Sequence, residues 1–211
     1  MVFIKIIIGI ISLAALYLVG TFLLSRLFIP NLGFKGKIKE KLPLEAKEKL
    51  MRITKETKDK NEVLKKVISY QLSRFYSEMR QVYPRFKFLF ESSFNKLWEK
   101  KGFLHCHQQN FVLRRLLLGT GIFTEKDIKL KHTFCYLNIH QYLKINIGNK
   151  KKEWIDVDPF AMSLGYDLGE VLPNFAYPSM KARGINPLRD PIKSKKILER
   201  TTMLSLFLKN K

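Results

Sequence analysis

The sequence has 211 residues, of which 46% are apolar, including 16 Phe and 8 Tyr. This length leaves room for one membrane anchor and one globular domain with its own hydrophobic core. The net charge of +21 indicates attraction to polyanions such as acidic lipid headgroups, and it carries no information about the fold. The two cysteines form no CxxC pair, which argues against a disulfide framework and against a cysteine-rich zinc site.

The first feature along the chain is an uncharged, mostly apolar stretch from Ile6 to Ser25. About 20 such residues is the length that a helix needs to cross a hydrocarbon core of about 30 Å. A cleaved signal peptide has a shorter apolar stretch followed by a small-x-small site, whereas here Ala14-Ala15 lies in the middle. We therefore expect residues 1–29 to be a retained, single-pass transmembrane anchor.

A basic segment follows the predicted anchor. It contains lysines at alternate positions, Lys35, Lys37, Lys39 and Lys41, against Lys5 and the terminal amine on the other side. The positive-inside tendency then places the soluble domain in the cytoplasm. Prolines and glycines within residues 30–43 predict a basic tether, and the domain itself is expected to span residues 44–211.

Helical patterns dominate the first half of the domain. From residue 44 to 82, apolar residues recur at spacings of one, three and four, which predicts a pair of amphipathic helices packed on the domain. A membrane-surface helix is the alternative, because the polar face is basic. A third helix is predicted to begin at Cys106, and its residues 111–118 are apolar nearly all round, as in a central, buried helix. Gly119-Thr120-Gly121 ends this helix.

Strand patterns follow. Residues 134–147 alternate between apolar and polar side chains, and so do residues 154–158, which Pro159 closes. Gly148-Asn149 between them indicates a hairpin. Beyond residue 160 we expect a further strand and a peripheral helix. Helices and an antiparallel sheet together predict an α+β fold.

One cysteine lies where a nucleophile could act. Cys106 opens a helix, where the helix dipole favours the thiolate. The alternative is that Cys106 is only a small buried hydrophobic residue, and Cys135 is expected near the start of a strand, where it is structural or exposed. A nucleophile also needs a base and a group that orients the base.

The predicted hairpin supplies both partners. If the chain turns about Asn149, His140 lies opposite Asp158, and opposed side chains have Cβ atoms about 4.5–5.5 Å apart. Asp158 could then fix the imidazole tautomer. A register slip of one or two residues would give this role to Asp156 instead.

Three short segments resemble the motifs of the transglutaminase-like superfamily. They are Gly102-Phe-Leu-His-Cys106 before an apolar helix with Gly121-Ile122 beyond it, His140-Gln-Tyr-Leu-Lys-Ile, and Trp154-Ile-Asp-Val-Asp158-Pro159. The match spans residues 95–161. The resemblance implies a nucleophile helix packed on an antiparallel sheet, and a catalytic triad of Cys106, His140 and Asp158. Lys144 departs from the family, in which an acidic residue is common at that position.

The resemblance implies a cysteine enzyme that acts on protein or peptide amides through a thioester. Water as acceptor would make it a protease or amidase, and an amine would make it an acyltransferase. No cofactor or metal is expected, because adjacent side chains in His105-Cys106-His107 point apart and no second pair of ligands stands at the usual spacing. Nucleic acid is not an expected partner, since the aromatic residues among the lysines suit core packing better. The alternative function is a non-catalytic scaffold of the same fold that binds anionic membrane or an acidic partner.

Overall fold

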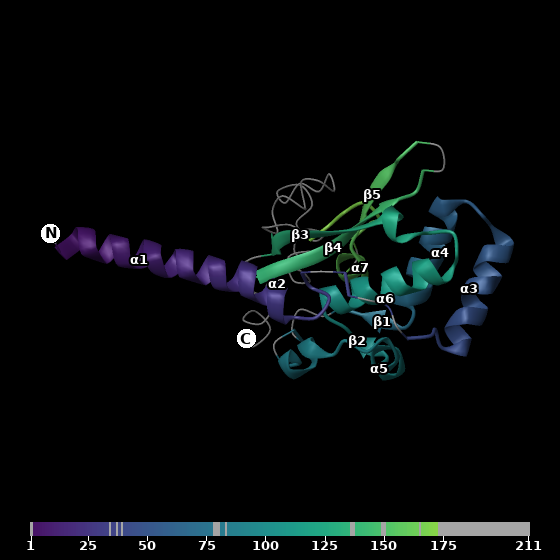
Figure 1. Ribbon diagram of the computed structural model, residues 1–211, viewed down its shortest axis with the longest axis horizontal. Coiled ribbons are helices and arrows are strands. Elements are labelled where there is room, and N and C mark those ends of the chain that lie inside the picture. The colour runs from purple at the N-terminus through teal and green to yellow at the C-terminus, as the bar shows by residue number, and fades with distance from the viewer. Residues whose placement is uncertain are drawn as a thin grey trace, which may run out of the picture.

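The computed structural model describes residues 2–33, 35–36, 38, 40–77, 81–82, 84–135, 138–148, 151–164 and 166–172 (Figure 1). Within these ranges the chain forms an N-terminal helical rod and a domain of helices and short strands, which confirms the α+β class. Most of the segment in which a further strand and a peripheral helix are predicted lies outside the described residues, and so does the side chain of Cys135.

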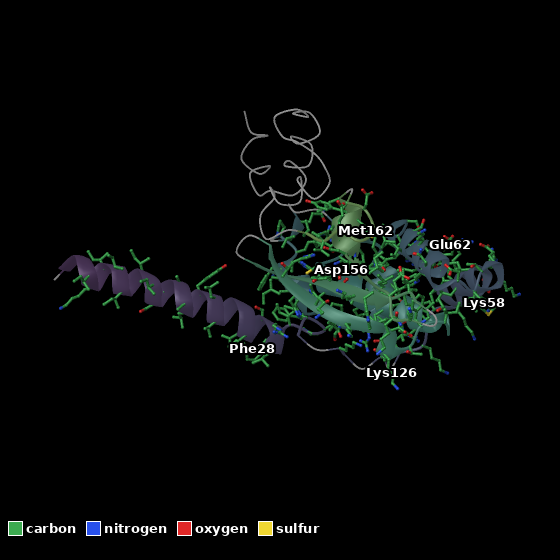
Figure 2. All side chains as sticks on the ribbon, turned by 90° about the horizontal axis from the view of Figure 1, so that it is seen from above. Phe28, Lys58, Glu62, Lys126, Asp156 and Met162 are labelled. Atoms are coloured by element: carbon green, nitrogen blue, oxygen red, sulfur yellow. The ribbon has the colours of Figure 1, made fainter. Side chains whose placement is uncertain are left out.

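The rod is helical along its whole length. Helix α1 (Val2–Val19) leads into a π-helical turn, η1 (Gly20–Leu24), and then into α2 (Ser25–Phe28). Figure 1 shows the rod projecting from the domain, and Figure 2 shows Phe28 at its base. Its apolar side chains face outward, with Leu16 69% and Leu27 62% exposed. No helix among the residues that the structure describes is long and apolar enough to cross a membrane.

The segment that follows the rod, expected to be a basic tether, is bound to the domain at several points. Leu32 is buried, and its carbonyl accepts hydrogen bonds from His132 Nε2 at 2.5 Å and Gln141 Nε2 at 2.6 Å. Further along, Arg114 donates to the carbonyl of Gly36 at 2.9 Å. The described part of residues 30–43 therefore fixes the base of the rod on the domain, and it is not a free linker.

The expected pair of helices is present. Helices α3 (Leu44–Glu56) and α4 (Lys60–Leu72) pack together, and α4 ends before residue 82 because the chain enters the two-residue strand β1 (Phe75–Tyr76). Two short helices that were not predicted follow, the 3-10 helix η3 (Phe86–Phe90) and α5 (Phe94–Lys100). With five and seven residues, they are too short to show a helical period in the sequence.

A three-stranded antiparallel sheet forms the other layer, in the order β3-β4-β5. Its strands are β3 (Ile128–Cys135), β4 (Asn138–Asn146) and β5 (Trp154–Val157), and β3 follows the 3-10 turn η4 (Glu125–Asp127). The prediction of one strand over residues 134–147 was wrong in its start, and β3 was missed. Exposed Lys129 and Lys131 alternate with inward-facing residues along this edge strand, and a lysine-rich stretch of that kind is easily read as a solvated surface.

The register of the hairpin also differs from the prediction. Leu143 pairs with Val157 and Lys144 with Asp156, so that the β4–β5 pairing is shifted by two residues from one that sets His140 opposite Asp158. The connection from Ile147 to Glu153 is longer than a two-residue turn, and Ile147 N donates to Glu153 O at 2.8 Å. A shift of two residues keeps each side chain on its expected face of the sheet.

Helix α6 (Cys106–Gly119) lies at the centre of the domain, as predicted. It packs against β4 and is flanked by α3, α4, α5 and α7 (Pro159–Ser163), as Figure 1 shows in part. The fully buried side chains that it adds to the core are Val112, Leu113, Leu116 and Leu117. This central position holds the start of α6, with Cys106, rigidly against the sheet.

Candidate active site

Cys106 is the first residue of α6 and is half-buried. The chain reaches it through the short strand β2 (Gly102–Phe103), which pairs in parallel with β1. Gly102 has φ of 86°, a backbone conformation that favours glycine, and its N–H donates to Arg74 O at 3.0 Å. This pairing sets the position of the residues that enter the helix.

Asn110, one helical turn beyond Cys106, ties α6 to strand β4. Its side-chain amide donates to the backbone carbonyl of Gln141 at 2.7 Å and lies 3.2 Å from the side-chain oxygen of the same residue. Asn110 and Gln141 are both buried, and Gln141 directly follows His140. Because a buried hydrogen bond of this kind is costly to break, the helix that carries the thiol and the strand that carries the imidazole keep one relative position.

His140 and Asp158 form a buried pair. His140 Nε2 lies 2.6 Å from Asp158 Oδ2, and the two side chains are 4% and 0% exposed. Asp158 also accepts from the backbone N–H groups of Ala161 at 3.1 Å and Leu172 at 3.0 Å. Because Nε2 faces the carboxylate, Nδ1 is the ring nitrogen left to exchange a proton with a thiol.

Asp156, the alternative partner of His140, lies elsewhere. It lies on β5 and pairs across the strands with Lys144, with 3.9 Å between Oδ1 and Nζ. The predicted choice of Asp158 over Asp156 as the hydrogen-bond partner of His140 therefore agrees with the geometry, although the register behind it was two residues off. His140 reaches Asp158 diagonally, because the position directly opposite Asp158 is two residues further along β4.

The charges around the thiol favour a thiolate and an imidazolium. Burial raises the pKa of Cys106, but the positive charge of His140 and hydrogen bonds from His107 and His140 outweigh it, and the pKa falls from 9.0 to about 6. Burial lowers the pKa of His140, but the charges of Asp158 and of the Cys106 thiolate, with their hydrogen bonds, hold it well above its ordinary value. Each group therefore stabilises the charged form of the other.

The two histidines beside Cys106, for which the sequence offered no explanation, hold a neighbouring segment in place. His105 Nε2 lies 3.2 Å from Arg85 O, and His107 Nε2 lies 3.0 Å from Leu89 O. Gln108 adds a bond to Phe88 O at 2.8 Å. The side chains of residues 105, 107 and 108 thus bind three carbonyls in and beside η3 and fix this segment next to the thiol.

His105 is kept uncharged at neutral pH. Burial lowers its pKa to about 4, against a smaller opposing effect of the hydrogen bond to Arg85 O. No group of three or more His, Cys, Asp or Glu side chains that could hold a metal ion occurs within the described ranges. His105 thus binds a backbone carbonyl, whereas His107 binds Leu89 O and also forms a hydrogen bond that stabilises the Cys106 thiolate.

A cavity of about 570 Å³ lies against Cys106. It extends between the base of the rod and η3, and both elements line it with large apolar side chains. The lining from the rod and from η3 includes Tyr17, Leu24, Phe28, Phe86, Leu89 and Phe90. The lining also includes His105, Cys106 and His107, where helix α6 begins. The thiol is thus reached through a largely apolar space.

The roles of Gln108, Asn110 and Gln141 were not predicted from the sequence. One signal was present, because residues 105–110 form a continuous polar run at the start of an otherwise apolar helix, and five of these six side chains are buried. Buried polar groups need partners, so such a run indicates a structured polar site.

Comparison of the chain with protein-family models, with curated proteins and with solved structures gave no match.

Proposed function

We propose that this protein is a transglutaminase-like cysteine enzyme in which Cys106 is the nucleophile, His140 the proton carrier and Asp158 the group that orients His140. The observation that carries the proposal is the buried pair of His140 and Asp158, 2.6 Å apart, together with a thiol at a helix start whose pKa is lowered by the charge of His140. The packing of α6 on an antiparallel sheet that carries His140 supports the transglutaminase-like architecture.

The proposed reaction has two halves. Cys106 Sγ attacks a carbonyl carbon, and as the bond to the amine or alcohol breaks, His140 gives its proton to the leaving group and a thioester remains. Water, or a second amine, then attacks the thioester while His140 takes up its proton, which restores the thiolate and imidazolium. The His105 side chain accepts from the backbone N–H of Gln108, and the earlier N–H groups of the first turn of α6, including that of Cys106, are proposed to stabilise the oxyanion.

We also propose that the rod anchors the protein in a membrane, with the domain on the cytoplasmic side. No single described helix is long and apolar enough to cross a membrane, so the support comes from the continuous helical path over α1, η1 and α2 together and from the outward-facing apolar side chains along it. An exposed apolar surface of this extent marks a region that is covered by lipid or by protein. The net charge of +21 adds attraction to anionic headgroups.

The second candidate function is a scaffold that keeps the fold without catalysis. The observation in its favour is the large positive charge, which suits an anionic surface whether or not the thiol reacts. The two functions differ in what they require of Cys106. A scaffold does not need a thiolate near neutral pH.

The rate of alkylation of Cys106 by iodoacetamide against pH tests the proposal. In the wild type we expect an inflection at about pH 6, since thiolate forms as the pH rises through the lowered pKa. His140→Ala removes the stabilising charge while burial still raises the pKa, so its inflection moves up by at least about 1 unit. Peptide mass spectrometry separates Cys106 from Cys135, and Cys106→Ser gives the blank.

The same pH dependence of Cys106 alkylation can contradict catalysis. An inflection near 9 in both the wild type and His140→Ala would show that no ion pair forms at the thiol. The scaffold would then be the better description. Lys144→Ala is the matched control, because Lys144 lies on the same strand and pairs with Asp156, so its inflection should remain that of the wild type.

A further inference from the structure

The cavity beside Cys106 differs in character from the rest of the candidate site. Its volume of about 570 Å³ falls within the range of small-molecule sites, about 300–1,000 Å³. Apart from the site residues themselves, its walls are mainly aliphatic and aromatic. A peptide substrate would bring backbone N–H and C=O groups into this space, and each would lose water without gaining a partner, at a cost.

The cavity is also continuous with exposed apolar surface. Phe28 at the base of the rod is 71% exposed, and Phe86 and Phe90 of η3 are 58% and 48% exposed, although all three line the cavity. Phe86 and Phe90 stack edge to face with ring centroids 5.9 Å apart. Apolar side chains thus extend from the rod along most of the cavity lining to the thiol, and the polar residues of this lining include Ser25, His105 and His107.

The remaining wall has a single reactive group. Cys106 lies at one side of the cavity, while the neighbouring His105 and His107 are engaged with backbone carbonyls at 3.2 and 3.0 Å. A molecule that fills the cavity therefore meets the nucleophile at one point only. A long chain with one carbonyl at its end matches this arrangement.

We infer that the substrate is an acyl lipid, whose unbranched acyl chain occupies the cavity between the rod and η3 and whose ester carbonyl lies at Cys106. This inference rests on the proposed function, and it replaces the protein amide expected from the resemblance with a lipid ester as the substrate. Cys106 Sγ bonds to the carbonyl carbon, the ester C–O bond breaks, and His140 protonates the leaving alcohol. Water then attacks the thioester while His140 takes up a proton from it, which releases a fatty acid and restores the thiolate and imidazolium.

The rod would also explain how such a substrate arrives. Tyr17, Gly20, Leu24 and Phe28 belong both to the rod and to the cavity lining. A lipid beside the rod in a bilayer would have its acyl chain next to the cavity without first leaving the apolar phase. Transfer of an acyl chain into water would otherwise cost about 0.8 kcal/mol for each methylene, which lowers the partition constant about fourfold for each one.

Labelling by a series of N-alkyl iodoacetamides, from methyl to dodecyl, measures occupation of the cavity on the full-length protein in one fixed detergent. The readout is the ratio of the Cys106 labelling rates for dodecyl and methyl probes. We expect this ratio to fall at least about tenfold in Leu24→Trp, because the indole fills the space that the chain needs, a loss of about two methylenes at fourfold each. Leu27→Trp is the matched control, since Leu27 is on the same rod, is 62% exposed and is not part of the cavity lining, and its ratio should equal that of the wild type.

The comparison separates the inference from the proposed function. Detergent partition of the probes affects all three proteins equally, so equal ratios in wild type, Leu24→Trp and Leu27→Trp would overturn the inference. If Cys106 still shows its inflection near pH 6, the proposed enzyme stands with another substrate. If the inflection is near 9 while the ratio depends on Leu24, the acyl-chain site stands and catalysis fails.

A second measurement identifies whether the acyl chain comes from a membrane lipid or from an acylated peptide. Full-length protein in phospholipid vesicles should release fatty acid, and Cys106→Ser should abolish the release. Release from a soluble N-acylated peptide, with none from the vesicles, would overturn the lipid and make an acylated peptide the substrate.

Discussion

Two walls meet at Cys106, and they are built in opposite ways. The wall formed by α6 and β4 is buried, and Asn110, Gln141 and Asp158 hold it together through hydrogen bonds of 2.6–3.2 Å. The wall formed by the rod and η3 is apolar, and several of its side chains are half exposed or more. The wall of α6 and β4 fixes the reacting atoms, whereas the wall of the rod and η3 supplies only apolar surface. Substitutions in the two walls should therefore differ in their effects on turnover, on stability and on membrane retention.

The largest difference is expected from the two aspartates near the sheet edge. Asp158→Asn should lower Cys106-dependent turnover by about 10⁴-fold, because an amide in place of the carboxylate favours the wrong imidazole tautomer. Asp156→Asn should change turnover less than about threefold, since it loses only a partly exposed ion pair with Lys144. Steady-state rates on a fatty-acyl ester, with thermal midpoints as a folding check, give the comparison. Equal losses in the two variants would show that Asp158 does not orient His140.

A pair of leucines compares the core with the rod. Leu116 on α6 is fully buried, and Leu116→Ala should lower the free energy of unfolding by about 2–5 kcal/mol through lost burial and a new cavity. Leu16 on the rod is 69% exposed, and Leu16→Ala should change the same quantity by less than about 0.5 kcal/mol. Urea unfolding of the full-length protein, followed by tryptophan fluorescence, measures both. A comparable loss in Leu16→Ala would mean that the rod packs on protein.

The smallest expected effect concerns the position of the rod in a bilayer. A charge near the middle of a spanning helix costs about 2.5–3.5 kcal/mol, and less near its end. Leu16→Arg should therefore reduce the fraction of protein that stays with membranes after an alkaline wash, and Leu27→Arg should reduce it less. Release of the wild type by high salt alone would show an electrostatic attachment and would contradict the proposed span.

The sequence allowed Cys106, His140 and Asp158 to be selected because each choice depended on a local pattern. The start of α6 follows from a change from polar to apolar residues, and the faces of β4 and β5 follow from alternation. The register was wrong by two residues, since the loop after Ile147 is longer than the Gly148-Asn149 signal indicates. The aspartate was still correct as the partner of His140 because a two-residue shift leaves every side chain on its face.

The cavity and the helix η3 that lines it could not be predicted from such patterns. Helix η3 is a five-residue element, and it is held in place by His105, His107 and Gln108, which come almost twenty residues later. Strand β3 was missed for a similar reason, since its exposed lysines are explained only by its place at the edge of the sheet. Both features depend on contacts between distant segments, which a local period does not record.

The joint between the rod and the domain has a mechanical consequence. Gln141 donates to the carbonyls of both Asn31 and Leu32 at 2.6 Å, and its own carbonyl accepts from Asn110 of the nucleophile helix. The rod therefore cannot tilt against the domain without disturbing the residue next to His140. If the rod stands in a bilayer, the thiol is held at one fixed depth, and only carbonyls at that depth meet it. Lateral diffusion within the lipid sheet, and not diffusion through bulk water, would then set the rate of encounter.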